Sequence, residues 1–262
     1  MSVTASAIAV LDIDGTLIDS NYHHALAWYR ALRSVGEIYP VWRLHRLIGM
    51  GGDQVVTAVG GEELERRVGD RAREQQGREV DELLEEMAPL PGARDLLVAV
   101  KERGHRLVLA SSAQQRHVEV FLDMLDARDV VDDWTTSADV ESSKPAPDLL
   151  HVALKKLGAP PDAASVMVGD SVWDVEAAKR AGMPAIVVRS GGFGDDELRK
   201  AGAIALYDTP RRPREGTGRH PTRLTPPPSS PGPPGCGARY RPRGEKHLPS
   251  HPQGSTATDD RQ

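Results

Sequence analysis

The stretch SAIAVLDIDGTLIDS, Ser6 to Ser20, joins the pattern of a buried strand to a group of carboxylates. The apolar run Ile8–Leu11 is followed at once by Asp12 and Asp14. Burying one unpaired carboxylate is costly, and burying two close together is costlier still. The stretch therefore predicts either an immediate turn into solvent or a positive charge that meets both acids where the strand ends.

Further apolar runs of strand length, rich in Val, Ile and Leu, recur along the chain with little alternation, as in parallel strands covered on both faces. The predicted strands are Ile8–Leu11, Leu107–Ala110, Val166–Val168, Ala185–Val188 and Ala203–Leu206. Helical patterns lie between them at Ala93–Arg103, Gln114–Leu125, Asp148–Leu157, Val172–Ala181 and Asp195–Ala201. This alternation predicts an α/β fold, a doubly wound parallel sheet with a Rossmann-like core.

The segment 21–88 breaks the alternation because it has no strand-like run. Its helical patterns are Tyr22–Val35, Val41–Ile48 and Glu62–Met87. We expect an inserted all-helical cap at 21–88, between the two parts of a discontinuous core at 1–20 and 89–208. Residues 209–262 hold twelve of the twenty prolines and few large apolar residues, so they predict a disordered tail without a catalytic role, or a frameshifted translation product.

The net charge of -5 is unevenly distributed. From Thr209 onward ten Lys and Arg oppose four Asp and Glu, which leaves 23 basic and 34 acidic residues in the first 208. The negative net charge of the first 208 residues argues against a nucleic-acid partner. The only cysteine, Cys236, excludes a disulfide framework, and Asp12 interrupts the N-terminal apolar run, so neither a signal peptide nor a membrane span is expected. These features predict a cytoplasmic protein and leave its oligomeric state open.

Polar side chains also follow the other predicted strands. Ser111 comes after Leu107–Ala110, Asp170 and Asp174 lie in GDSVWD after Val166–Val168, and Lys144 lies between them in SSKPAPD. Each has a simpler interpretation alone, such as a helix cap or a solvated lysine. Because the carboxyl ends of parallel strands meet at one edge of a sheet, their joint occurrence predicts a ligand site there.

The motifs DIDGTLIDS, the serine after an apolar strand, KPAPD and GDSVWD, in this order, resemble the four motifs of the haloacid dehalogenase superfamily. The resemblance spans Ile8 to Leu206, and the insertion after the first motif resembles the helical C1-type cap of phosphoglycolate phosphatase and beta-phosphoglucomutase. It implies a phosphatase that hydrolyses a small phosphorylated metabolite through an aspartyl-phosphate, with Mg²⁺ as cofactor. An acid at position 14 is unlike the dehalogenases and the P-type ATPases of the superfamily.

The resemblance also implies roles for the acids. Asp12 would be the nucleophile and a metal ligand. Asp14 would ligate the metal through its backbone carbonyl, and its side chain would protonate the leaving oxygen and then accept a proton from water. Asp170 would complete the metal ligands, and Asp174 would orient the site around them.

Ser111 and Lys144, by the same resemblance, would hold the phosphoryl oxygens as charge develops on them. Around the site we expect ordinary structural roles. His23 and His24 are expected to be exposed helix histidines, Trp28 and Trp42 to belong to the core of the cap, and the charges of Glu62–Glu86 to form a solvated helix face.

Two alternatives stay open. His23 and Trp28 resemble a pattern of the mutase-like members, which favours a sugar-phosphate mutase of the beta-phosphoglucomutase type. The loop Gly49–Asp53 offers no cation for a second phosphate, which argues against it. From another class, a non-catalytic phosphate- or RNA-binding protein is conceivable, but Asp12, Asp14, Lys144 and Asp170 are all present, and the Arg-rich tail has only one aromatic residue to stack on bases.

Overall fold

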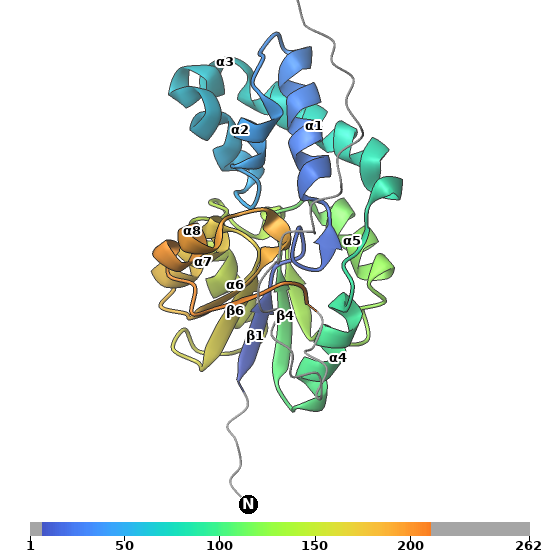
Figure 1. Ribbon diagram of the computed structural model, residues 1–262, viewed down its shortest axis with the longest axis vertical. Helices are drawn as coiled ribbons and strands as arrows, with labels where there is room; N and C mark the ends of the chain where they lie inside the picture. Colours follow the sequence, from blue (N-terminus) through green and yellow to red (C-terminus); the bar gives the residue numbers. More distant parts are fainter. Residues whose placement is uncertain (1–6, 211–262) are drawn as a thin grey trace, which may run out of the picture. The chain divides into compact units, whose positions relative to one another are not determined.

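The computed structural model describes residues 7–210, which form one compact unit. A parallel six-stranded sheet with the strand order β5-β4-β1-β6-β7-β8 forms its centre (Figure 1). The strands are β1 (Ile8–Leu11), β4 (Arg106–Ala110), β5 (Asp133–Thr135), β6 (Ser165–Gly169), β7 (Ala185–Val188) and β8 (Ala205–Tyr207). The predicted doubly wound α/β fold is confirmed, whereas the predicted tail lies, from residue 211 on, outside the described residues.

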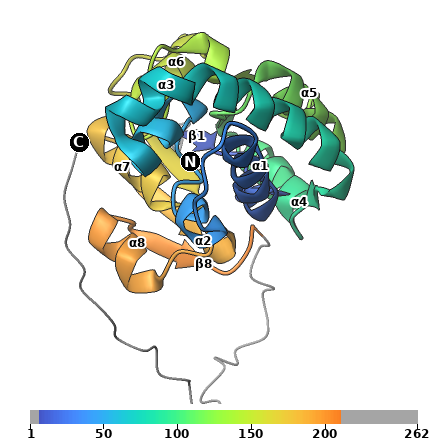
Figure 2. The same ribbon diagram turned by 90° about the horizontal axis from the view of Figure 1, so that it is seen from above.

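Successive side chains of the central strands point to opposite faces of the sheet, and those of β1 are apolar on both. Helices therefore cover both faces. Ala9 and Leu11 of β1 pack on one face with α4 (Ala93–Glu102) and α5 (Gln115–Met124). Ile8 and Val10 pack on the other face, in the cluster formed with α6, α7 and α8 (Figures 1 and 2). These helices are α6 (Asp148–Lys156), α7 (Val172–Arg180) and α8 (Asp195–Ala201). All strands of this sheet run parallel, so their carboxyl ends share one edge.

Three helices occupy the segment after β1 and form a helical insert above that edge (Figure 1). They are α1 (Asn21–Ser34), α2 (Val41–His45) and α3 (Gly52–Leu83), and a short 3₁₀ turn (Leu84–Glu86) follows. Trp28, Leu32 and Leu44 belong to a hydrophobic core that the insert builds for itself. The chain enters and leaves the insert through an antiparallel pair, β2 (Ile18–Asp19) with β3 (Ala88–Pro89).

Some details differ from the sequence predictions. The short strand β5 was not predicted, because Asp133–Thr135 is too short and too polar to show a buried-strand pattern. Helix α3 begins at Gly52 rather than at Glu62, and it has a kink at Gly61, where φ is +79°. Trp42 is 69% exposed, so its assignment to the core is wrong, whereas Trp28 is buried as predicted. Within residues 7–210 no helix is long and apolar enough to cross a membrane.

Candidate active site

The loop after β1 places the first two acids in different surroundings. Asp12 is 3% exposed, and its Oδ1 accepts a hydrogen bond from Lys144 Nζ. Asp14 faces the insert instead: Ser20 Oγ donates to its Oδ1 at 2.7 Å, and His24 Nε2 lies 2.8 Å from the same oxygen. One carboxylate therefore meets a buried cation, and the other meets donors at the start of α1.

Gly15 makes this divergence possible. Its φ is +74°, and a Cβ at this position would lie 2.3 Å from Asn21 Nδ2 and 2.4 Å from Asp170 Oδ2. Only glycine combines that backbone conformation with so little space. Asn21 Nδ2 donates to Asp170 Oδ2 at 2.6 Å, and Thr16 Oγ1 donates to Asp170 Oδ1 at 3.2 Å. The β1 loop and the first residue of α1 therefore fix the carboxylate of the β6 loop.

The loop after β6 aims a second carboxylate at the lysine. Ser171 is the N-cap of α7 and forms a capping box with Asp174, which the serine hydroxyl and backbone hold through Asp174 Oδ2 at 2.6 and 3.1 Å. Asp174 Oδ1 accepts a hydrogen bond from Lys144 Nζ at 2.8 Å. Asp174 thus joins the start of α7 to the buried ammonium group of Lys144.

Lys144 is 1% exposed and lies between two carboxylates, those of Asp12 and Asp174. Burial alone would lower the pKa of its ammonium group, but the two carboxylates outweigh this effect and raise that pKa above its ordinary value. The lysine therefore stays charged in the interior, where it can hold anionic oxygens.

Three carboxylates surround this single ammonium. Oxygen atoms of Asp12, Asp170 and Asp174 lie within 4.8 Å of one another. Burial raises the pKa of Asp12 to about 7, and burial together with Asp174 and Asp12 raises the pKa of Asp170 well above its ordinary value. One ammonium cannot balance three carboxylates, so the cluster fits a divalent cation, and its oxygen ligands suit Mg²⁺.

The pKa of Asp14 is shifted the other way. Burial would raise it, but His24, by charge and by hydrogen bonding, and Ser20 together hold the pKa below its ordinary value. Ser111, buried at the end of β4, donates from Oγ to Asp14 Oδ2 at 3.4 Å and accepts from the Ala113 amide at 3.0 Å. The carboxyl ends of β1, β4 and β6, with the Lys144 loop, thus bring all six predicted site residues to one edge of the sheet.

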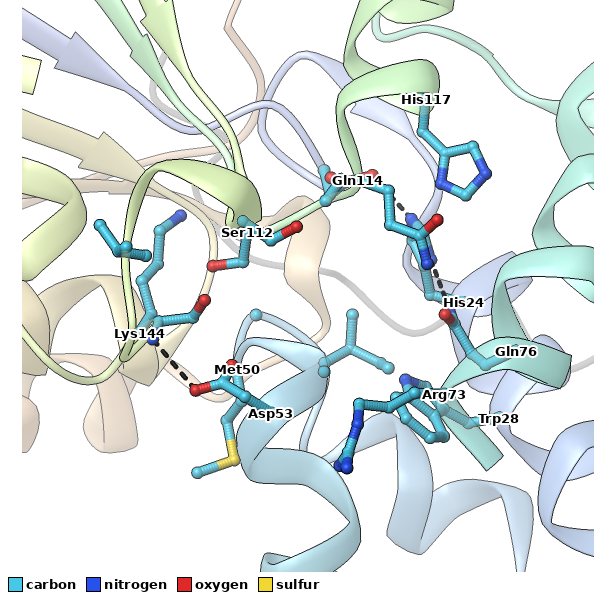
Figure 3. A pocket seen from close by; sticks show the side chains of 18 of the residues that line it. His24, Trp28, Met50, Asp53, Arg73, Gln76, Ser112, Gln114, His117 and Lys144 are labelled. Atoms are coloured by element: carbon cyan, nitrogen blue, oxygen red, sulfur yellow. Dashed lines mark hydrogen bonds and ion pairs between the residues drawn. The ribbon is translucent and has the colours of Figure 1, made fainter. Parts of the chain in front are cut away.

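A cavity of about 240 Å³ opens above these residues (Figure 3). Asp12, Asp14 and Lys144 line it from the sheet side. Further lining side chains from the insert are His24, Trp28, Met50, Asp53, Arg73 and Gln76, and those from the sheet domain include Ser112, Gln114 and His117. The cavity therefore lies between the insert and the carboxyl edge of the sheet.

Two lining residues correct the sequence predictions. The side chain of His24 is 11% exposed and contacts Asp14, because α1 begins at Asn21 and turns this residue toward the β1 loop. Arg73 was assigned to a solvated face, but it lines the cavity: its Nη2 bonds Glu65 and Asp70, both at 2.7 Å, while its buried Nη1 has no hydrogen-bond partner. No spacing in the sequence could have identified Arg73, since the cavity forms only when α3 packs above the sheet.

Residues 9–188 match the family model of the haloacid dehalogenase-like hydrolases, and the chain belongs to this family. A phosphorylated carbohydrates phosphatase of Thermotoga maritima is 32% identical over 203 residues, which cover 75% of this chain and 92% of that protein. A phosphoglycolate phosphatase of Aquifex aeolicus is 30% identical and covers 67% of this chain and 81% of its own length. The predictions of an enzyme and of a phosphatase are confirmed, which removes the non-catalytic alternative.

Solved structures agree with this placement. A hydrolase from Pseudomonas syringae superposes with a TM-score of 0.73 at 32% identity, covering 78% of this chain and 94% of that one. The CbbY protein of Rhodobacter sphaeroides in complex with phosphate gives a TM-score of 0.61 at 27% identity over 79% of this chain and 95% of its own. The fold is therefore shared with both of these solved structures.

Proposed function

We propose that the protein is a Mg²⁺-dependent phosphatase that hydrolyses a small phosphate monoester through an aspartyl-phosphate on Asp12. The observation that carries this proposal is the buried cluster of Asp12, Asp170 and Asp174 around Lys144, of which Asp12 and Lys144 line the cavity. Such a cluster is costly to fold and has a use only where an anionic group must meet both a nucleophile and cations.

Asp12 is the group placed to attack phosphorus, because its carboxylate lines the cavity floor. Lys144 Nζ orients Asp12 and holds a phosphoryl oxygen as negative charge develops during transfer, and Ser111 Oγ assists at the end of β4. A bound Mg²⁺, held by Asp12, Asp170 and the backbone carbonyl of Asp14, would offset the repulsion between the attacking carboxylate and the phosphate. Asp174 holds the Lys144 ammonium group in position by accepting a hydrogen bond from Nζ.

Asp14 moves the protons. Ser20 and His24 hold its carboxyl group toward the cavity and lower its pKa, whereas an anionic substrate beside it would raise that pKa, so Asp14 takes up a proton as the substrate binds and then passes it to the leaving oxygen. The same group, now a carboxylate, accepts a proton from the water that attacks the aspartyl-phosphate. Inorganic phosphate is released, and Asp12 is regenerated.

The walls of the cavity indicate the class of leaving group. Gln76 and Gln114 offer uncharged donors and acceptors, and Ser112 Oγ and Arg73 Nη1 are buried without a hydrogen-bond partner. Buried polar atoms are nearly always paired, so these two atoms indicate contacts that a ligand makes. We propose a hydroxyl-bearing phosphate ester with a further anionic or strongly accepting group, in keeping with relatives named for carbohydrate phosphates, phosphoglycolate and validoxylamine A 7'-phosphate.

We also propose that the insert acts as a cap domain, residues 21–88, over a core formed by 1–20 and 89–208. The two-stranded pair β2–β3 supports this division, since it is where both connections cross between the insert and the sheet. A cap of this kind excludes water from the cavity during phosphoryl transfer.

A panel of phosphorylated metabolites, assayed for phosphate release with Mg²⁺ and with excess chelator, tests the proposal. We expect turnover of one or more esters with Mg²⁺ and none with chelator; equal rates in both would overturn the metal-assisted mechanism. Conversion of a hexose 1-phosphate to its 6-phosphate faster than phosphate appears would instead establish the mutase.

A further inference from the structure

The loop between α2 and α3 lies directly on the segment that carries Lys144. The Gly51 amide donates to the Lys144 carbonyl at 3.1 Å, and the Ser143 amide donates to Asp53 Oδ2, also at 3.1 Å. The second bond is the dashed line between the insert and the lysine segment in Figure 3. Two hydrogen bonds from one short stretch of the insert thus fix the backbone on both sides of the lysine's Cα.

The approach of the two segments is very close. A Cβ on Gly51 would lie 2.0 Å from Ser143 Cβ, and a Cβ on Gly49 would lie 2.4 Å from Ser171 Oγ. Ser171 caps the helix that carries Asp174, the second partner of Lys144. The loop Gly49–Asp53 therefore touches the lysine segment and the loop of its carboxylate partner together.

A negative charge at Asp53 needs an explanation, because of where this side chain lies. Its carboxylate lines a cavity that receives an anionic phosphate ester, where a negative charge opposes binding. The neighbouring Gln54 also donates a hydrogen bond, from its Nε2 to Asp53 Oδ2 at 2.8 Å. Asp53 is itself exposed and lies in the first turn of α3, and its carboxylate accepts a charge-assisted hydrogen bond from the amide of the buried Ser143.

We propose that Asp53 is a positioning residue, which holds the Ser143–Lys144 backbone so that Lys144 Nζ is in place only when the insert lies against the sheet. This inference rests on the proposed role of Lys144 in phosphoryl transfer. In this proposal, the Lys144 ammonium group reaches its position beside Asp12 only when the insert covers the substrate. Chemistry then starts only after water has been excluded.

The test compares Asp53→Ala, Asp53→Asn and a matched control, Glu62→Gln, which removes an exposed charge from the same helix. Single-turnover and steady-state rates are measured with Mg²⁺ on p-nitrophenyl phosphate and on glucose 6-phosphate. Hydrogen–deuterium exchange of the Ser143 amide is followed in the same samples. Misplacement of a catalytic group by about 1 Å costs up to roughly 100-fold. We expect Asp53→Ala to lower kcat by about 30-fold with KM changed less than about threefold.

Three features of the result separate positioning from substrate contact. The loss in kcat should be equal, within about threefold, for both substrates, Asp53→Asn should recover part of it through its amide oxygen, and Ser143 exchange should accelerate at least about tenfold in Asp53→Ala alone. A loss confined to KM, or one that depends on the leaving group, would overturn the proposal. Wild-type turnover tests the proposed function separately, and an unchanged Ser143 exchange rate would defeat the positioning role whatever the activity.

Discussion

Replacing Asp12 by asparagine should stabilise the metal-free protein at alkaline pH while abolishing turnover. In the metal-free fold, burial raises the pKa of Asp12 from 3.8 to about 7. An unfolded chain, whose Asp12 titrates near the ordinary value, binds fewer protons than the folded chain between these two pKa values. The free energy of unfolding therefore falls as the pH rises from about 4 to about 7, and this contribution is constant above pH 7.

The size of the effect follows from the shift. One pKa unit corresponds to about 1.4 kcal/mol, so ionising Asp12 costs the metal-free fold roughly 4 kcal/mol at pH 8. The substitution also takes one of two carboxylates from Lys144, which leaves a net gain of about 2 to 4 kcal/mol at that pH. Near pH 4 this gain should be absent, because Asp12 is already protonated in the folded wild type.

Urea unfolding followed by circular dichroism, in chelator at pH 4, 5, 6, 7 and 8, measures this difference. Asp162→Asn, at an exposed loop position, controls for the loss of a surface charge. Adding Mg²⁺ should stabilise the wild type more than the variant and so narrow the gap. A difference between Asp12→Asn and wild type that does not grow with pH would refute the reasoning, as would detectable single-turnover phosphate release by the variant.

Other expectations follow from the same contacts. His24→Phe removes the side chain that holds the Asp14 carboxyl group toward the cavity and should lower kcat by about tenfold for esters with poor leaving groups, with a smaller effect on p-nitrophenyl phosphate, whose leaving oxygen needs no proton. Arg73→Gln should raise KM about tenfold for phosphoglycolate, which carries a second anion, and leave p-nitrophenyl phosphate within about twofold; equal effects on both would contradict a contact with the leaving group. Truncation after Pro210 should leave the Mg²⁺-dependent rate and Tm nearly unchanged, because the residues removed have few large apolar side chains; a large loss of either would show that they pack on the core.

The elements that the sequence predicted well are those whose signal is local. Strands β1 and β7 have the predicted bounds, because continuous apolar runs flanked by polar residues and glycines leave little choice. Asp12, Lys144 and Asp170 could be identified together since each follows or precedes an element whose direction is set by the parallel sheet. The parallel sheet brings these residues together, and the alternation of strands and helices in the sequence already predicts such a sheet.

The residues that sequence reasoning missed depend on the insert. In the sequence, His24 is one of two adjacent histidines in a predicted helix. Which of the two contacts Asp14 depends on the residue at which α1 begins. Arg73 lies among many charged residues of α3, and its contact with the cavity depends on how that helix packs. Asn21 and Asp53 act through single hydrogen bonds across 149 and 90 residues of sequence, a separation at which no spacing rule applies.

The two acids of the first motif are therefore stabilised by different parts of the molecule. Asp12 has its counter-charge within the sheet domain, in Lys144, and the remaining cost of burying its charge is what the proposed Mg²⁺ would offset. Asp14 obtains its donors from the connection into the insert and from α1, so its pKa and direction depend on where the insert lies. The insert also bonds the backbone of the lysine segment through Gly51 and Asp53. If Asp14 is the proton donor, as proposed, its placement and the shape of the cavity depend on the same helices, since α1 supplies His24 and both α1 and α3 supply residues that line the cavity.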